Sequence, residues 1–173
     1  MRSLLALYVA RHEPRKDWRV HFRSALATGL AVTLIGWLSV TTGLPLLLAP
    51  LGPTAMLIFG QPASPGAQPI NIFAGYLIGT IFALLASIMP DSWWLATLGV
   101  SFTMLAMLVL RVTHPPAAAV PLLVYSNPVD PVTLFLIPFL ACLLLVVLGV
   151  GVHRLPPRQR YPLPLADVVS RPT

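Results

Sequence analysis

An arginine, a threonine and a histidine stand close together ahead of two prolines, between two apolar stretches of the chain. They are Arg111, Thr113 and His114, followed directly by Pro115 and Pro116. A charged side chain costs about 3 kcal/mol near the middle of a bilayer on insertion scales, so Arg111 must reach water, headgroups or an anion. The other interpretation is a plain anchor at a helix C-terminus, where a cation meets the helix dipole. For His114, a structural cap and a ligand-binding role stay equally open.

Two short apolar segments, 44–60 and 112–126, are interrupted by proline. Proline breaks the helical hydrogen-bond ladder and favours the first turn of a helix, so we expect short helices to begin near Pro53 and Pro116. A helix N-terminus carries about half a positive charge and N–H groups without helical partners. Two such N-termini that converge would form an anion site. The amides after both prolines are therefore predicted to bind an anion, together with the Arg, His and Thr side chains.

The candidate substrate-binding residues lie in these two segments and in the polar loops that follow them. They are Gly52, Pro53, Thr54, Ala55, Gln61, Ser64, Gln68, Asn71, Arg111, Thr113, His114, Pro115, Pro116, Ala117, Ala118 and Asn127. The predicted spans contain no acidic residue, which argues against a carboxylate proton relay or a cation pathway. Catalytic residues are not predicted, because an enzyme needs a nucleophile–base pair or a metal triad. The single cysteine, Cys142, offers neither a disulfide nor a metal cluster, and no cofactor is expected.

The composition is that of a membrane protein. Hydrophobic residues make up 57% of the 173 residues and charged residues only 9%. A soluble domain typically carries about 25% charged residues, whereas a lipid-facing surface needs none. Four runs reach the length of about 20 apolar residues that crosses a bilayer; they are 24–43, 70–89, 92–110 and 132–152. The sequence therefore predicts an all-α, polytopic transmembrane helical bundle.

Basic residues cluster on both sides of the apolar part of the chain. Five lie within 11–23 and three within 154–160, and the net charge is +6. This is the positive-inside pattern, which places both termini in the cytoplasm and the protein in an inner membrane. It argues against a nucleic-acid partner and favours contact with lipid headgroups. The predicted parts are a basic N-terminal segment 1–23, a membrane domain 24–152 and a Pro-rich basic tail 153–173, which is expected to be extended on the surface or disordered.

The two halves of the membrane domain look alike. A shift of 63 positions, without a gap, places Pro53 on Pro116. Each half, about 24–89 and 92–152, would contain a long helix, a proline-broken short helix and a second long helix, an arrangement that marks the binding site of repeat-built transporters. If the short segments cross, six spans form inverted repeats and Arg111 lies inside, as the charge pattern favours. If they are re-entrant, four spans form parallel repeats.

These motifs together resemble the HPP family of integral membrane proteins. The resemblance covers about residues 20–152 and rests on an ordered set of motifs: Leu51-Gly52-Pro53-Thr54-Ala55, then Ser64-Pro65-Gly66-Ala67-Gln68-Pro69-Ile70-Asn71, then Gly75 and Gly79, then Arg111 and His114-Pro115-Pro116. It implies a multi-spanning protein of the bacterial inner membrane, from a family whose plant and cyanobacterial members are associated with nitrite transport. The chain departs from the family where Ala117 to Ala119 replace glycines, which puts the substrate in doubt. It also lacks the CBS domains that some members carry.

The leading hypothesis is a transporter or channel for a small inorganic anion, with nitrite as the substrate that the resemblance implies. A non-transporting membrane module, such as an assembly or sensor subunit, is the alternative. An intramembrane enzyme is the least favoured class. The expected partners are the anion, membrane lipid and further copies of the chain, because so few helices leave little protein to enclose a path and glycine faces suit close helix packing.

Overall fold

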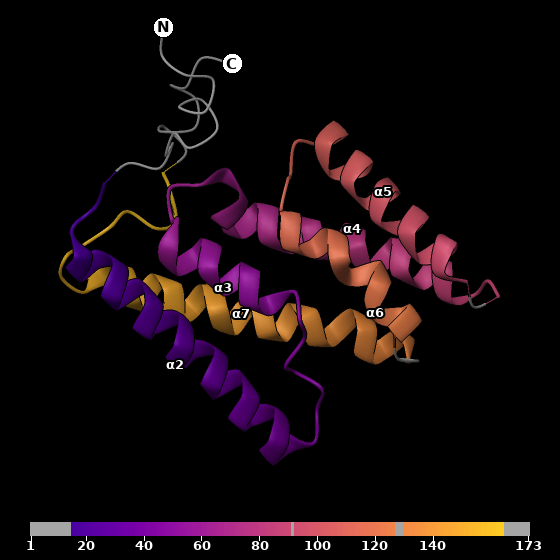
Figure 1. Ribbon diagram of the computed structural model, residues 1–173, viewed down its shortest axis with the longest axis horizontal. Helices are drawn as coiled ribbons and strands as arrows, with labels where there is room; N and C mark the ends of the chain where they lie inside the picture. The colour runs from indigo at the N-terminus through magenta and orange to yellow at the C-terminus, as the bar shows by residue number, and fades with distance from the viewer. Residues whose placement is uncertain (1–14, 91, 127–129, 165–173) are drawn as a thin grey trace, which may run out of the picture.

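The structure, a computed structural model, describes residues 15–90, 92–126 and 130–164. Over these ranges it is a bundle of six α-helices and two 3₁₀ segments without a β-strand, which confirms the all-α prediction (Figure 1). The elements are α2 (Trp18–Thr42), α3 (Leu51–Gly60), η1 (Pro65–Ala67), α4 (Pro69–Ser87), α5 (Trp93–Val109), η2 (Pro115–Ala119), α6 (Val120–Ser126) and α7 (Pro131–Arg154).

Three of the helices, α2, α4 and α7, are long and apolar enough to cross a membrane. They contain 25, 19 and 24 residues, or about 28–38 Å at 1.5 Å per residue. Helix α5 contains 17 residues and is at the short end of the range for a spanning helix. Of the four long runs that the sequence predicts, three therefore have clear spanning length. The two proline-broken segments form the short helix α3 and the short pair η2–α6, as predicted.

The chain reverses direction at each short segment. Lys16, just before α2, donates a hydrogen bond from Nζ to the carbonyl oxygen of Gly60, the last residue of α3, over 3.2 Å. Helix α3 therefore returns to the end where α2 begins. Arg23 on α2 donates from Nη1 to the Leu155 carbonyl oxygen, just after α7, over 3.0 Å. The start of α2 and the finish of α7 thus lie together at one end of the bundle (Figure 1).

The turn before η2 lies at this same end. Gly66, between α3 and α4, packs on it so closely that a Cβ atom at Gly66 would lie 3.4 Å from Pro115 Cδ and 3.5 Å from the Thr113 carbonyl oxygen. Arg111 is therefore on the side of the molecule where the six-segment arrangement puts it. We call this side the basic end, and it comprises residues 15–23, 60–68, 111–113 and 154–164.

Glycines on the long helices let the two short segments approach closely. On α4, a Cβ at Gly75 would lie 2.8 Å from His114 Cβ, and one at Gly79 would lie 2.5 Å from the Ala117 carbonyl oxygen. On α7, a Cβ at Gly149 would lie 2.4 Å from Ile58 Cγ2. Small residues at helix interfaces are typical of membrane bundles. The pattern Gly75-x-x-x-Gly79 therefore forms the surface of α4 against which η2 packs, and we call this surface the seat of η2.

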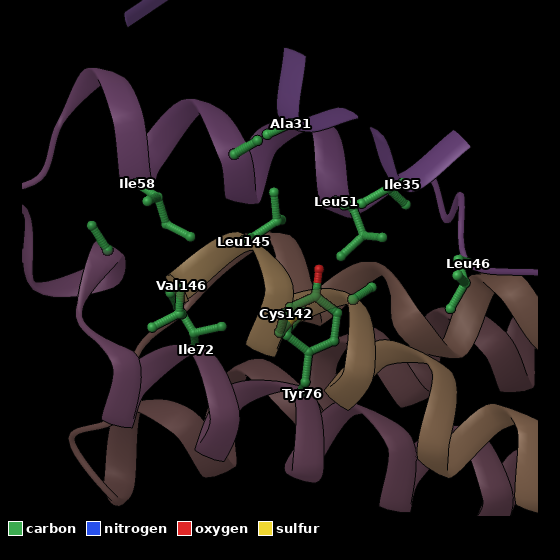
Figure 2. Packing of buried hydrophobic residues seen from close by; sticks show 14 of the residues in the cluster. Ala31, Ile35, Leu46, Leu51, Ile58, Ile72, Tyr76, Cys142, Leu145 and Val146 are labelled. Carbon is green, nitrogen blue, oxygen red and sulfur yellow. The ribbon is translucent and has the colours of Figure 1, made fainter. Parts of the chain in front are cut away.

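A hydrophobic core lies between α2, α3, α4 and α7 (Figure 2). Leu51 and Ile58 of α3, Tyr76 of α4 and Leu145 of α7 are all at most 1% exposed within it. Cys142 is also fully buried there, as a small apolar residue would be. The outer faces of the long helices carry exposed leucine, isoleucine, valine and phenylalanine, which suits contact with lipid.

The described part of the tail is irregular and mostly exposed, but it is attached to the bundle. Tyr161 is only 7% exposed. The backbone N–H of Leu163 donates to Gln68 Oε1 over 2.8 Å. Residues 155–164 therefore fold back on the basic end, because buried apolar contact and hydrogen bonds replace the solvent that a free tail would have. The prediction for 165–173 lies outside the described residues.

Candidate functional site

His114 and Thr54, from the two proline-broken segments, meet inside the bundle together with Tyr76. All three are 0% exposed. His114 Nε2 lies 2.9 Å from Thr54 Oγ1, and Thr54 Oγ1 lies 2.9 Å from the Tyr76 hydroxyl. His114 Nδ1 lies 2.7 Å from the carbonyl oxygen of Gly66. We call Thr54, Tyr76 and His114 the buried cluster. Polar groups in the membrane interior are expensive and mark functional sites.

The hydrogen bonds of the buried cluster fix part of its protonation. A carbonyl oxygen only accepts, so His114 Nδ1 carries a hydrogen and donates to Gly66. When the imidazole is neutral, Nε2 is an acceptor and competes with the Pro50 carbonyl oxygen, 2.9 Å away from Thr54 Oγ1, for the single hydroxyl hydrogen of Thr54. When Nε2 is protonated, it donates to Thr54 and Thr54 donates to Pro50. The cluster can therefore take up one proton without losing a hydrogen bond.

Several elements position the buried cluster. Thr54 lies in the second turn of α3, and His114 is the residue directly before η2. Tyr76 lies between the two glycines on which η2 is seated, and its ring is 5.4 Å from the His114 ring, centroid to centroid. The Cys142 thiol on α7 interacts with the Tyr76 hydroxyl. The cluster thus joins both halves of the chain, and full burial closes it on every side in this conformation.

The prediction of free amides at the start of α3 is wrong in this structure. The helix begins at Leu51, two residues before Pro53, after a turn at 49–50. The N–H of Leu51 donates to the Leu48 carbonyl oxygen over 3.0 Å, and that of Thr54 donates to the Pro50 carbonyl oxygen over 3.2 Å. Ala55 follows inside the helix, fully buried. The preceding turn supplies the acceptors, so no anion is needed to satisfy these donors.

The same correction holds for the second segment. After Pro116 the chain is a 3₁₀ segment, in which each N–H bonds to the carbonyl three residues before it. The N–H of Ala117 donates to the His114 carbonyl oxygen over 3.0 Å, and the next segment follows directly at Val120. Ala118 is half-buried within this turn. The two N-termini therefore contribute side chains to the buried cluster rather than free amides.

Arg111 lies apart from the buried cluster. It is exposed and closes the C-terminus of α5 with φ 58°, the single positive φ among the described non-glycine residues. Its N–H donates to the Leu108 carbonyl oxygen over 3.2 Å, and the N–H of Val112 donates to Met107 over 3.0 Å. This is a Schellman motif, in which glycine is the usual residue. Of the two interpretations, the helix-end position is present, while the anion-binding role stays a prediction.

The polar residues of the first loop divide into two groups. Gln68 donates from Nε2 to the carbonyl oxygens of Pro62 and Ser64, over 2.8 and 3.1 Å. Asn71 donates from Nδ2 to the Pro65 carbonyl oxygen over 2.8 Å. These two amides therefore hold the loop in shape, and with it the Gly66 carbonyl that bonds His114.

Other members of the loop line an open groove of about 610 Å³ at the basic end. The groove is lined by cationic and polar side chains together with loop backbone: Lys16, His21, Met56, Gly60, Gln61, Pro62, Ala63, Ser64, Gln159, Arg160 and Leu163. Lysine and arginine beside amide and hydroxyl groups attract anions. Gln61 and Ser64 are the candidate residues that it includes.

The remaining candidate residues surround these two places or fall outside them. Thr113 is half-buried at the turn against Gly66, and Pro116 is buried. Pro53 and Pro115 are exposed and Gly52 is half-buried; they shape the backbone. The prediction for Asn127 lies outside the described residues. The structure thus brings Thr54 and His114 together and separates both from Arg111.

Tyr76 was not among the residues singled out from the sequence. A tyrosine within an apolar run reads as one more large core residue. Its position between Gly75 and Gly79 could have indicated a role. Two glycines on a helix let another segment approach closely, and that segment then contacts the residue between them. The groove residues Gln159 and Arg160 were not predicted, because the tail was expected to be extended on the surface or disordered.

Fold and site together define a polytopic helical membrane protein with a sealed polar cluster at the contact of two broken segments. The chain belongs to the HPP family: the family model described as HPP, transmembrane region, matches residues 13–162. This confirms the resemblance drawn from the motifs. Comparison with curated proteins and with solved structures finds no match.

Proposed function

We propose that this protein transports a small inorganic anion, with nitrite as the first candidate, across the inner membrane of a bacterium. The observation that carries the proposal is the buried cluster: two proline-broken segments deliver Thr54 and His114 to Tyr76 in the interior of the bundle, held together at 2.9 Å. Paired broken segments at mid-membrane are the usual place of a transport site. Membership of the HPP family supports a membrane function of this kind.

The chemistry of the cluster favours an anion over a cation. Two hydroxyls and an imidazole supply hydrogen-bond donors, whereas a cation needs carboxylates or carbonyl oxygens. The acidic residues that the structure describes, Asp17 and Asp130, are both N-caps at helix starts rather than interior residues. Uptake of a proton at His114 Nε2 would add one more donor, because Nδ1 already donates to the Gly66 carbonyl oxygen. A buried imidazolium is costly alone and is stabilised by a neighbouring anion, so we propose that proton and anion enter the cluster together.

The groove at the basic end supports a route to the cluster. Its Lys16 and Arg160 would concentrate anions, and its loop residue Ser64 is two positions from Gly66, which bonds His114. We propose that the basic end faces the cytoplasm, as the positive-inside pattern favours. In the sealed conformation the route is shut, and movement of the loop 61–68 would open it.

We further propose that the two halves are inverted repeats and that the chain works as a homo-oligomer. The packing supports the repeat, because α3 packs on α2 and α7 while η2–α6 packs on α5 and α4. The shift of 63 positions carries the range of α3 onto 114–123 and that of α4 onto 132–150, close to η2–α6 and α7. The exposed apolar faces of a bundle this small leave room for contacts between copies.

The test is anion flux into liposomes that contain the purified protein. We expect nitrite uptake above that of empty liposomes, and a loss of at least tenfold for His114→Ala with the protein still incorporated. Thr103→Val is the matched control, because Thr103 is equally buried but bonds only to Gly99 of its own helix. Flux equal to that of empty liposomes for nitrite, nitrate and formate alike would contradict the proposal. Co-purification of a stoichiometric partner would then favour a non-transporting module.

A further inference from the structure

The described end of the chain forms a strap across the basic end. The strap comprises residues 155–164. Arg23 on α2 holds its first part: Nη1 donates to the carbonyl oxygens of Leu155 and Pro157, and Nη2 donates to Gln159 Oε1 over 3.1 Å. Three acceptors from one segment on a single guanidinium give a fixed attachment. The strap is therefore a built part of the fold.

Its second attachment reaches the loop that supports the buried cluster. Gln68 accepts from the Leu163 N–H at Oε1 over 2.8 Å, while its Nε2 donates within the loop. The same loop bonds His114 through the Gly66 carbonyl oxygen. The strap is thus linked, through one loop, to the site of the proposed function. Gln159, Arg160 and Leu163 of the strap also line the groove.

Between these two attachments the strap inserts Tyr161 into the bundle. The residue is 7% exposed, and its ring lies on Gly149 of α7, where a Cβ would be 3.1 Å from Cε1. The ring is 5.4 Å from that of His153, centroid to centroid. A Cβ atom at 149 would force the Tyr161 ring to shift by a few tenths of an ångström. The notch at Gly149 therefore receives two neighbours, Ile58 of α3 and Tyr161 of the strap.

The Tyr161 hydroxyl is buried and has no hydrogen-bond partner among the residues that the structure describes. The same is true of Nδ1 on the neighbouring His153, whose Nε2 donates to the Ile58 carbonyl oxygen over 2.7 Å. A buried polar atom without a partner costs free energy, and most such atoms in folded proteins are satisfied. With Nε2 donating, His153 Nδ1 is an acceptor, so the Tyr161 hydroxyl is the donor of the two that could serve an anion.

The Tyr161 hydroxyl oxygen is itself buried. Burial raises the pKa of Tyr161, and the nearby Cys142 thiol raises it further. The hydroxyl therefore keeps its proton and remains a donor, and it is close enough to Cys142 to interact with it. Cys142 in turn lies beside Tyr76. The Cys142 thiol is therefore an electrostatic neighbour of both Tyr161 and Tyr76.

We propose that Tyr161 is an anion-binding residue at the basic end of the transport path. Its hydroxyl donates to a small inorganic anion that moves between the groove and the buried cluster. The inference rests on the proposed function and extends it to a residue outside the membrane helices. Lys16, Arg23 and Arg160 at the same end supply the attraction that brings an anion rather than a neutral molecule to this donor.

The experiment compares Tyr161→Phe with Tyr125→Phe in the full-length protein. The first removes the buried hydroxyl and keeps the ring in its notch, and the second makes the same change at an exposed tyrosine of α6. Binding is measured as thermal stabilisation in detergent by sodium nitrite, with sodium gluconate at equal ionic strength as the blank. We expect about tenfold weaker nitrite binding for Tyr161→Phe and no change for Tyr125→Phe. In liposomes, KM should rise by the same factor with kcat within about twofold.

Each outcome bears on the proposal. Equal nitrite affinity in wild type and Tyr161→Phe overturns it and leaves Tyr161 as packing. No stabilisation of the wild type by nitrite, nitrate or formate overturns it as well. Binding that weakens in Tyr161→Phe without any wild-type flux supports the anion site and refutes transport, so the two proposals fail separately. Tyr161→Leu, which also fills the notch, serves as a second variant if the phenylalanine protein is unstable, with the same weaker binding expected.

Discussion

The two junctions between a long helix and a short segment are built differently. The first, from α2 to α3, turns on Gly43 at φ 70°, continues through an extended stretch and starts a regular α-helix. The second, from α5 to η2, turns on Arg111 at φ 58° and leads within three residues to His114. A left-handed conformation costs an L-residue about 1–2 kcal/mol, which glycine avoids.

The second junction therefore has a destabilising backbone conformation at a non-glycine residue, and the first does not. Backbone strain in folded proteins concentrates at functional sites. The first junction contains no charge and supports Thr54 through a helix turn already satisfied by Pro50. The second places a cation at a strained turn and a histidine directly after it. The second junction is therefore the stronger candidate for the functional half, and the first for its support.

The largest expected effect comes from adding a Cβ atom at the glycines against which the two short segments pack. A Cβ at Gly79 would meet the Ala117 backbone oxygen at 2.5 Å, whereas one at Gly149 would meet the Cγ2 methyl of Ile58 at 2.4 Å. A backbone oxygen cannot move without its peptide group, whereas the methyl can move through a change of the Ile58 χ1 angle, so Gly79→Ala should lower the free energy of unfolding by about 3 kcal/mol and Gly149→Ala by about 2 kcal/mol. Thermal unfolding in detergent measures both. Gly52→Ala, whose Cβ meets nothing within 4 Å, should cause no loss.

If Gly149→Ala lowered the free energy of unfolding more than Gly79→Ala, the contact of α3 with α7 would be the more rigid of the two, and the contact of η2 with α4 the less rigid. Nitrite flux adds a second measure. Tyr76 of the buried cluster lies between the two α4 glycines that contact η2, whereas α7 at Gly149 contributes no member of the cluster. Gly79→Ala should therefore reduce flux among molecules that remain folded, and Gly52→Ala should not.

An intermediate effect is expected from the hydroxyl that joins the two junctions. Thr54→Val keeps the volume of the side chain but leaves His114 Nε2 and the Tyr76 hydroxyl without their shared partner, so stability should fall by about 2 kcal/mol. Thr103→Val removes an equally buried hydroxyl that bonds only to Gly99 at 2.7 Å, and should cost less than about 1 kcal/mol. Chemical or thermal unfolding of both variants separates them. Equal losses would show that the buried cluster adds nothing beyond ordinary burial.

Much of this architecture is readable from the sequence because the membrane constrains it. Uncharged runs of spanning length, proline within short apolar segments and basic flanks predict an all-helical bundle with broken segments, and the structure contains them. The meeting of Thr54 with His114 could also be anticipated, since Thr54 directly follows Pro53, His114 stands two positions before Pro116, and these two prolines match under the 63-residue shift. These signals are local, or depend on a repeat visible in one dimension.

What could not be predicted depends on contacts between distant segments. The amides after Pro53 and Pro116 look free in sequence, yet the turn at 49–50 and the 3₁₀ geometry of η2 supply acceptors that no propensity rule specifies. Gln68 looks like a donor for a ligand, but its amide is used by its own loop and by the strap. Tyr161 looks like part of a loose tail, and only the notch at Gly149 explains its burial.

The smallest expected effect comes from the residue with the left-handed backbone conformation at each junction, Gly43 in the first and Arg111 in the second. Arg111→Gly should relieve the left-handed strain and raise the free energy of unfolding by about 0.5–1 kcal/mol, after the greater backbone entropy of glycine in the unfolded chain is deducted. Gly43→Ala should lower it by about 1 kcal/mol. Unfolding in detergent measures both signs. Because a stabilised protein should not lose activity through misfolding, a fall in nitrite flux for Arg111→Gly would assign the cation a role in anion transport. Unchanged flux would leave Arg111 as an anchor at the helix end and shift the functional weight of the second junction to His114 alone.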